Sequence, residues 1–520
     1  MYIAPNTTIK ILRNVPLDLT YDHTIYFAPD SYGNTAQYNF FSSKTKYTLT
    51  EQSYQRVKRG WIRVGIVADN LYDCNYIMFQ NTNFGNKWFY AFIKTVEYIN
   101  NAVSEIEFEI DVMQTWNSNY TLDRCFVERE HSAEGDKLSL YTAESLEAGV
   151  LEYRYDPTEA IDMNDMTVVI LSTPPTPPDG EYIHGLYFNN TYFAVDIQAV
   201  DLTHHGTDSV DAIVTELIHQ NRKIVAMYQY PSAFNLPDHP IGLSQTIERT
   251  TTRPNSVGGG PIVYIPKNKK LLFYPYSFIR VSANGGKYQD YMYEHFDYPY
   301  YKFDISCIKA PEANVVIYPK DYKNLSKCYE EKMIVSDFPI CAWATNAFEQ
   351  WWANNKWGLL FDGISKSLTL GTSALINPAL AMKQTPSIVG DSANIIGEFV
   401  QAKNAPNNVS GNVSTGNINA ALRQQAIRIY NMSITRERAI VLDDYFDRYG
   451  YATGRNKVPN RNVRPHWCYT KTLNCSITGS IPCDDARKIC NIYDHGITFW
   501  KNGAEVCNYS LDNTINEGVS

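Results

Sequence analysis

The chain has 520 residues, of which 44% are hydrophobic and 19% are charged, so it is long enough for several ordered domains of about 100 to 200 residues each. Its net charge of −9 excludes a protein that grips nucleic acid by counterion release, because that mode of binding needs a net basic surface. Aromatic residues make up 13% of the chain and include 39 Tyr, a composition that favours β-strands.

The first residues, MYIAPNTTIKILRNVPLD, contain neither a basic segment nor an apolar run of signal-peptide length. We therefore expect a protein that is made in a cytoplasm and is not secreted, so that its ten Cys remain thiols. The cysteines from Cys468 to Cys490 are separated by six, seven and six residues, which differs from the closer spacing of zinc knuckles. Buried thiols are favoured over a metal site.

Residues 76–116 predict a β-meander, because three apolar or alternating runs are separated by the turn-like stretches NTNFGN and NNAVSE. In the last run, Ile106, Phe108 and Ile110 alternate with acidic residues. A period of two places the apolar side chains on one face of a strand and the carboxylates on the other. The predicted acidic face consists of Glu105, Glu107, Glu109 and Asp111.

Carboxylates at this spacing lie about 6.5 to 7 Å apart along a strand, which is within the range of an inverting glycosidase pair. A solvated strand face gives the same spacing, and the sequence identifies no aromatic platform for a sugar. A structural or electrostatic role is therefore favoured over catalysis.

Residues 131–341 predict a second β-rich region. Its strand-like runs are MTVVIL, KIVAMY, PIVYIP and KKLLFYPYSFIRV, and the Pro-rich STPPTPPDG and the Gly-rich SVGGGP lie between them.

Two helices flank an unusual segment in the last third of the chain. Residues 342–357 have Trp343, Ala347 and Trp351 at helical spacing. The sequence ITRERAIVLDDYFDRYGY predicts a second, amphipathic helix that ends at Gly450, with the adjacent Asp443 and Asp444 on a solvent face. After it, strand patterns return in WCYTKTLNCSITGSI and GITFWKN, around a short helix at CDDARKICNIYD.

The segment between those helices differs from the rest of the chain in composition. Residues 358–429 contain no Tyr, Trp, His or Cys, and they are rich in Gly, Ala, Ser and Leu. Such a stretch is neither a solvated linker nor an aromatic-rich fold.

No motif supports an enzyme. His204 and His205 are adjacent, and neither they nor His219 belong to a zinc-protease pattern. The SVGGGP stretch lacks the Lys-Ser/Thr of a phosphate loop, and no GxSxG occurs. We expect no catalytic residues, no metal and no cofactor.

Several stretches together resemble the tail knob (distal tail tube) proteins of φ29-like short-tailed bacteriophages of Gram-positive hosts. The N-terminal stretches are YIMFQNTNFGNKWFYAFI and FEIDVMQTW, and KKLLFYPYSF, RYGY and DHGITFW follow in the same order. The resemblance spans most of the chain, with a divergent region at about 131–260.

The resemblance implies a mainly β (α+β) fold, with β-barrel or sandwich domains that assemble as a hexameric ring and two helices that flank a long apolar loop. It implies four consecutive parts: an N-terminal tube domain (1–130), a middle knob region (131–341), a region with a helix and the plug loop (342–430) and a C-terminal tube region (431–520). The plug loop itself is residues 358–416. The ring would be located at the distal end of the tail in the virion, below upper tail or collar proteins, and DNA would pass through it without specific binding.

The resemblance also implies that the apolar loop plugs the tube and then enters the host membrane. As a helix, residues 358–382 would be about 37 Å long, enough for a hydrocarbon core of roughly 30 Å, although Pro378 and Pro386 interrupt a continuous helix. Asp362 and Lys366 oppose insertion but lie four residues apart in the favourable order for an ion pair. The residues expected to enter lipid are Leu359, Leu360, Phe361, Ile364, Leu368, Leu370, Leu375, Ile376, Leu380 and Met382.

In such a tube, the four carboxylates of the acidic face are expected to line the channel and repel phosphate. The alternative is a tail-associated hydrolase of cell-wall glycans, or a receptor-binding protein whose middle region grips a wall polymer.

Overall fold

The computed structural model describes residues 6–28, 34–52, 60–172, 185–188, 191–194, 196–201, 209–220, 222, 224–234, 244–283, 286–297, 299–308, 314–335 and 425–515. The chain forms two compact units, each built from non-consecutive segments. The first comprises Met1–Leu151, Ser256–Tyr276 and Ile434–Ser520, and the second comprises Glu152–Asn255 and Ser277–Ser433. The four consecutive domains expected from the sequence stay a prediction.

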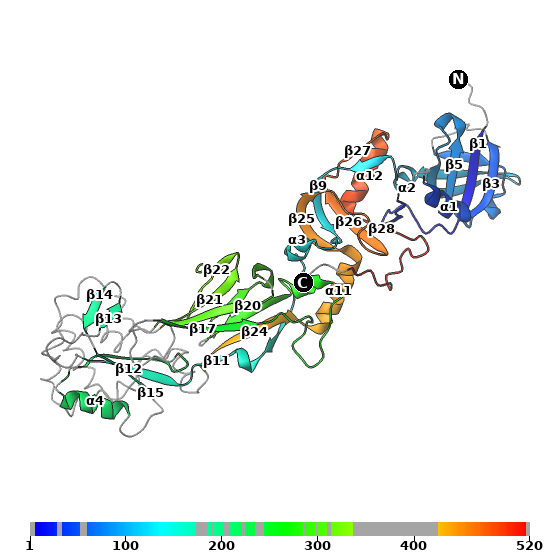
Figure 1. Ribbon diagram of the computed structural model, residues 1–520. Coiled ribbons are helices and arrows are strands. Elements are labelled where there is room, and N and C mark those ends of the chain that lie inside the picture. The colour runs from blue at the N-terminus through cyan, green and yellow to red at the C-terminus, as the bar shows by residue number, and fades with distance from the viewer. Residues whose placement is uncertain are drawn as a thin grey trace, which may run out of the picture. The chain divides into compact units, whose positions relative to one another are not determined.

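The N-terminal part of the first unit is a six-stranded antiparallel sheet (Figure 1). Its strands, in spatial order, are β3 (Thr45–Gln52), β1 (Thr7–Arg13), β5 (Cys74–Asn81), β6 (Phe89–Asn100), β7 (Val103–Ile110) and β4 (Trp61–Val64). The predicted meander is confirmed, because β5, β6 and β7 are consecutive and paired. The apolar side chains of this sheet, among them Ile9, Ile77 and Ile106, form a core on one face.

The C-terminal part of the first unit contains a five-stranded sheet together with α-helices. In spatial order the strands are β2 (His23–Ile25), β28 (Ile497–Trp500), β26 (Trp467–Leu473), β9 (Cys125–Glu130) and β25 (Tyr451–Lys457). The pair β2 and β28 is parallel, and the other pairs are antiparallel. Strands β8 (Tyr120–Leu122) and β27 (Ile477–Gly479) form a small separate ladder.

The helices of the first unit are α1 (Thr35–Ser43), α2 (Val112–Thr115), α3 (Lys137–Tyr141), α11 (Arg436–Tyr449) and α12 (Cys483–His495). The two helices predicted near the C-terminus are confirmed as α11 and α12. Helix α11 begins after Thr435, whose side chain accepts a hydrogen bond from Arg438 N–H, and ends at Gly450. Gly450 has φ 63°, a backbone conformation that favours glycine.

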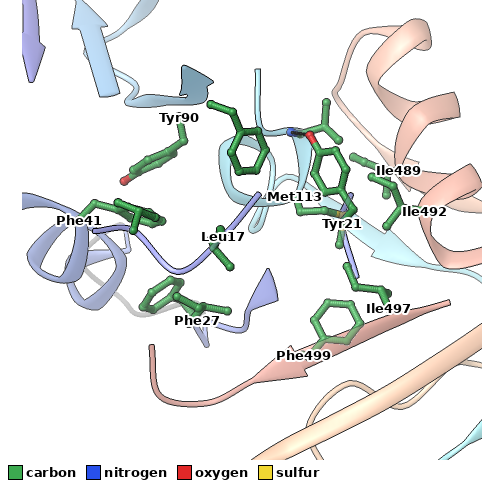
Figure 2. Close-up of a cluster of buried hydrophobic side chains, with 14 of the residues drawn as sticks. Leu17, Tyr21, Phe27, Phe41, Tyr90, Met113, Ile489, Ile492, Ile497 and Phe499 are labelled. Carbon is green, nitrogen blue, oxygen red and sulfur yellow. Dashed lines mark hydrogen bonds between the residues drawn. The ribbon is translucent and has the colours of Figure 1, made fainter. Parts of the chain in front are cut away.

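A hydrophobic core joins residues from the strands, loops and helix α1 of the N-terminal part to helix α12 (Figure 2). Phe41 and Tyr90 belong to the N-terminal part of this core, whereas Ile489 and Phe499 come from α12 and β28. These buried side chains are separated by about 400 residues of sequence. Burying large aromatic and aliphatic groups contributes about 1.5 to 3 kcal/mol each, so this core holds the two ends of the chain together.

The second unit consists of antiparallel sheets. One contains β10 (Leu151–Tyr155), β24 (Ala426–Ile434), β18 (Ser277–Ser282) and β19 (Tyr288–Tyr291), with β11 (Ile161–Asp162) paired to β24. Another contains β17 (Ser244–Thr251), β20 (Tyr301–Ile308), β21 (Asn314–Tyr322) and β22 (Leu325–Lys327), with β23 (Met333–Val335) paired to β21. A third contains β15 (Asp196–Asp201), β12 (Met166–Ser172) and β16 (Ile224–Pro231), and helix α4 (Val210–His219) covers it. Strands β13 (Gly185–Phe188) and β14 (Thr191–Ala194) form a separate two-stranded sheet.

The strand predictions for the middle region are partly wrong. MTVVIL and KIVAMY are strands β12 and β16, but PIVYIP contributes only the isolated bridge between Val257 and Tyr264. KKLLFYPYSFIRV is not one strand: Lys269–Leu272 is a 3-10 helix, and β18 begins at Ser277, after Pro275. A proline has no N–H to donate to a ladder, which explains why the strand starts beyond it.

Candidate functional site

The three glutamates predicted to share one face of the meander do so. Along β7, Ser104, Ile106 and Phe108 are buried, whereas Glu105, Glu107 and Glu109 lie on the more exposed side. The exposed fraction of these side chains rises along the strand, from 13% at Glu105 to 28% at Glu107 and 40% at Glu109. Alternation therefore places the carboxylates opposite the core, as predicted.

The same face also carries basic residues from other strands and from a helix, which the sequence of β7 alone does not indicate. Arg63 of β4 donates from Nε to the Glu105 carboxylate at 2.9 Å. Lys94 of β6 lies 3.6 Å from the Glu107 carboxylate and 3.8 Å from that of Glu109. Glu109 also forms an ion pair with Lys488 of α12.

The expectation of a strongly acidic face is therefore wrong. Each of the three glutamates has a basic partner within its own chain, and Glu97, which lies opposite Glu105 in the ladder, adds one further carboxylate. Exposed pairs of this kind contribute little stability, typically about 0 to 1 kcal/mol, but they cancel most of the local charge. In the described part of β4, β6 and β7 the face is close to neutral.

Asp111 does not belong to this face, which corrects the fourth predicted channel residue. Strand β7 ends at Ile110, and Asp111 is the N-cap of α2, with its side chain 1% exposed. It accepts hydrogen bonds from the backbone N–H of Met113 at 3.0 Å and of Gln114 at 3.1 Å, and from the Tyr76 hydroxyl at 2.8 Å. Burial raises the pKa of Asp111 to about 6. A carboxylate at the start of a helix satisfies free N–H groups, so its role is structural.

Polar contacts connect the end of the meander to α12 and to strand β2. The Trp116 indole N–H donates to the Asp485 carboxylate at 2.8 Å, and the hydroxyls of Tyr120 and Tyr493 lie 3.2 Å apart. The Gln114 amide donates to the Ile25 carbonyl at 2.8 Å. These bonds fix the charged face relative to α12, which supplies one of its bases.

Asp443 was expected on a solvent face, and this expectation is also wrong. Asp444 is exposed, but Asp443 is 1% exposed and accepts four hydrogen bonds from the segment 264–268. Its donors are the Tyr264 hydroxyl at 2.7 Å, the backbone N–H of Lys267 and Asn268 at 2.7 and 2.9 Å, and the Asn268 amide at 2.7 Å. Buried carboxylates are found where such donors satisfy them.

A second polar centre lies beside α11. His131 accepts a hydrogen bond at Nδ1 from Tyr469 N–H (2.8 Å), so its Nε2 carries the proton and donates to the Asp447 carbonyl at 3.0 Å. Burial lowers the pKa of His131 to about 3, and burial also raises the pKa of the Asp447 carboxyl to about 6. These groups couple the first unit's stability to pH.

The nine cysteines in the described ranges are free. Cys468 is buried as expected, but Cys483 and Cys507 are exposed. Within those ranges, no group of three His, Cys, Asp or Glu side chains is arranged to hold a metal ion.

The predicted helix at 342–357 and the loop at 358–416 lie outside the described residues, as do all ten side chains expected to enter lipid. Among the helices that the structure describes, none is long and apolar enough to cross a membrane.

Comparisons with known proteins confirm the predicted resemblance. Residues 241–514 match the family described as Bacillus phage phi29, Tail knob protein gp9, C-terminal domain, and residues 5–121 match the family described as Caudoviral major tail protein N-terminus. The chain is similar to tail knob protein gp9 of Bacillus phage PZA (25% identity) and of Bacillus phage phi29 (24% identity), in each case over 98% of both chains. The solved tail knob protein gp12 of bacteriophage C1 shares the fold, with a TM-score of 0.57 and 13% identity over 98% of this chain and 99% of that chain.

Proposed function

The chain belongs to the family of the Bacillus phage phi29 tail knob protein gp9, and we propose that six copies form a ring that closes the distal end of a short tail. It is a structural protein of the virion tail. The N-terminal match to a major tail protein family supports a tube-forming role for the six-stranded sheet. In the proposed assembly the ring joins upper tail or collar proteins and conducts the genome outward.

The charged face of β7 is proposed to line the channel through Glu105, Glu107 and Glu109. The sequence suggested that an acidic wall would repel DNA. In the structure this face is instead close to neutral, because Arg63, Lys94 and Lys488 pair with these glutamates. A basic wall would hold DNA by releasing counterions from its phosphates, and a wall that is close to neutral does not. Such a surface lets DNA move past without specific binding.

The apolar segment 358–416 is proposed to plug the tube and then to enter the host membrane. On an insertion scale, its ten apolar residues between Leu359 and Met382 together favour lipid by about 3 to 6 kcal/mol per copy. Asp362 and Lys366 at the centre of a membrane would together cost about 5 to 7 kcal/mol, enough to cancel that gain. Insertion therefore requires these charges to lie near the membrane surface or to face a water-filled lumen formed by several copies.

The ring is tested by the mass of the purified full chain in solution. A subunit of 59.4 kDa predicts a particle of about 356 kDa for six copies. A monomer at micromolar concentration would contradict the proposal.

The membrane role is tested with dye-loaded liposomes under conditions that release the segment. Deletion of 358–416 should abolish leakage while leaving the assembled particle intact, because the first unit is held together by cores built from residues 9–122 and 463–506. A matched variant replaces 358–416 with a Gly-Ser linker of equal length, which keeps the loop but removes its apolar side chains. Full leakage from the linker variant would show that the apolar residues are not responsible.

A further inference from the structure

The sheet β10, β24, β18 and β19 in the second unit has one buried face and one aromatic face. On the buried side, Ile279, Ile427 and Ile429 are fully covered. Their sequence neighbours point to the opposite side, as strand geometry requires. The aromatic face consists of Tyr153, Tyr155, Tyr288, Tyr430, Arg280 and Arg428.

Ring contacts make this face continuous across the strands. The Tyr430 ring lies 5.1 Å from the Tyr153 ring and 5.4 Å from the Tyr155 ring, measured between centroids. Tyr430 is directly opposite Arg280 in the ladder, and the Arg280 guanidinium carbon lies 4.0 Å from the centroid of the Tyr288 ring. The rings and the guanidinium therefore form one surface from β10 to β19.

Much of this aromatic area is open to solvent. Tyr153 is 61% exposed, Tyr288 is 59% exposed and Tyr155 is 36% exposed. Exposed aromatic clusters on a sheet mark interaction sites more often than isolated apolar side chains do. This face is separate from the charged face of β7, which belongs to the first unit.

The charges on the face favour an anion. Arg280 donates from Nε and Nη2 to the two oxygens of Asp290, at 2.7 and 2.8 Å, and this pair is internally balanced. Arg428 lies opposite Ser282 in the ladder, and among the residues that the structure describes its guanidinium has no hydrogen-bond or ion-pair partner. Arg428 and Tyr430 share this face of β24, and within the described residues the Arg428 guanidinium forms no ion pair, either with Asp290 or with Asp162, which lies opposite Ala426 on the same face.

We propose that the aromatic face binds an anionic glycan, with sugar rings stacked on Tyr153 and Tyr155 and an acidic group of the polymer paired with Arg428. The residues between the rings are polar, including Ser282 and Asp290, whereas the core of a protein interface is typically apolar. Hydroxyl and carboxylate groups at these positions match the hydroxyls of a sugar. The proposal concerns attachment and does not depend on the ring or the plug.

The chain's net charge makes a specific test possible. With a charge of −9, the protein repels polyanions at long range, so any binding requires local contacts. The experiment measures binding of the full-length protein to immobilised dextran sulfate, an anionic glucan, and compares it with neutral dextran and with inorganic polyphosphate. Strong binding to dextran sulfate and weak binding to the other two probes is the expected result.

Three single variants locate the site. Tyr153→Ala, Tyr155→Ala and Arg428→Gln should each weaken dextran sulfate binding by roughly fivefold or more, through lost stacking or a lost charge-assisted contact. Tyr329→Ala is the matched control, because Tyr329 is 61% exposed in the same unit but outside the aromatic face. Unchanged circular dichroism should accompany all four substitutions.

Three outcomes would overturn the proposal. Absence of dextran sulfate binding is one, and polyphosphate binding that is equally strong and insensitive to the tyrosine substitutions is another. The third is loss of self-association in the face variants without any effect on glycan binding, which would assign the face to contacts between copies. Particle mass is measured on the same variants, so a failure of the ring and a failure of the glycan site are distinguished.

Discussion

Replacing Asp443 with Ala should open the segment 264–268 selectively. The substitution removes the acceptor for the Tyr264 hydroxyl and for the backbone N–H groups of Lys267 and Asn268. Asp444 provides the matched control, because it is the adjacent residue of the same helix and is exposed.

The expected cost follows from the donors that lose their partner. A buried donor without an acceptor costs about 1 to 3 kcal/mol. Loss of the acceptor for two backbone N–H groups should therefore lower the free energy of opening this segment by about 2 to 6 kcal/mol. Because Lys267 is exposed and water can reach its N–H, we expect a loss of about 3 kcal/mol. Asp443→Asn retains one side-chain oxygen and should fall between wild type and Asp443→Ala, whereas Asp444→Ala should change stability by about 0.5 kcal/mol or less.

Hydrogen exchange measures this opening directly, because the amides of Lys267 and Asn268 are the groups that Asp443 protects. A local cost of about 3 kcal/mol corresponds to roughly a hundredfold faster exchange in Asp443→Ala. Equal exchange in the Asp443→Ala and Asp444→Ala proteins would refute the inference that the buried carboxylate holds this segment.

Three further outcomes are expected. Burial raises the folded-state pKa of Asp111 to about 6 from 3.8, so the protonated carboxyl stabilises the fold at low pH, and this contribution is lost as the pH rises through about 6. In thermal unfolding, the stability of wild type relative to Asp111→Asn should therefore fall between about pH 4 and about pH 7. A stability difference that stays constant over this range would argue against the raised pKa. Gly450→Ala should prevent normal folding, since its Cβ would lie 2.2 Å from the Glu130 carbonyl carbon, whereas Gly454→Ala, at a positive φ of 54° with open space around it, should cost about 1 kcal/mol in a denaturant titration. In virions, the double substitution Glu105→Lys and Glu109→Lys should slow genome release, most strongly at low salt, because a basic wall binds phosphate; release at the wild-type rate at every salt concentration would remove these residues from the channel.

Patterns that depend on near neighbours were predictable. Alternation along 103–110 placed Glu105, Glu107 and Glu109 on one face, and helical spacing with a terminal glycine gave α11 and its end. Each of these depends on the geometry of a single element, which the sequence specifies locally.

Features that depend on remote partners were not predictable from such patterns. Asp111 continues the acidic alternation in sequence, but the strand ends before it and its acceptor role involves Tyr76. In sequence, Asp443 looks like any surface acid on a helix. The contact that shows otherwise comes from Asn268, which is 175 residues away in the chain. The near-neutral charge of the β7 face likewise required bases from two other strands and from α12.

The central claim is a ring whose lumen is filled by residues 358–416, and electron-microscopic images down the ring axis test it most directly. The account predicts six subunits around a channel, with central density in the full-length protein and an open lumen in the protein that lacks 358–416. Single subunits, or identical central density in both proteins, would contradict it.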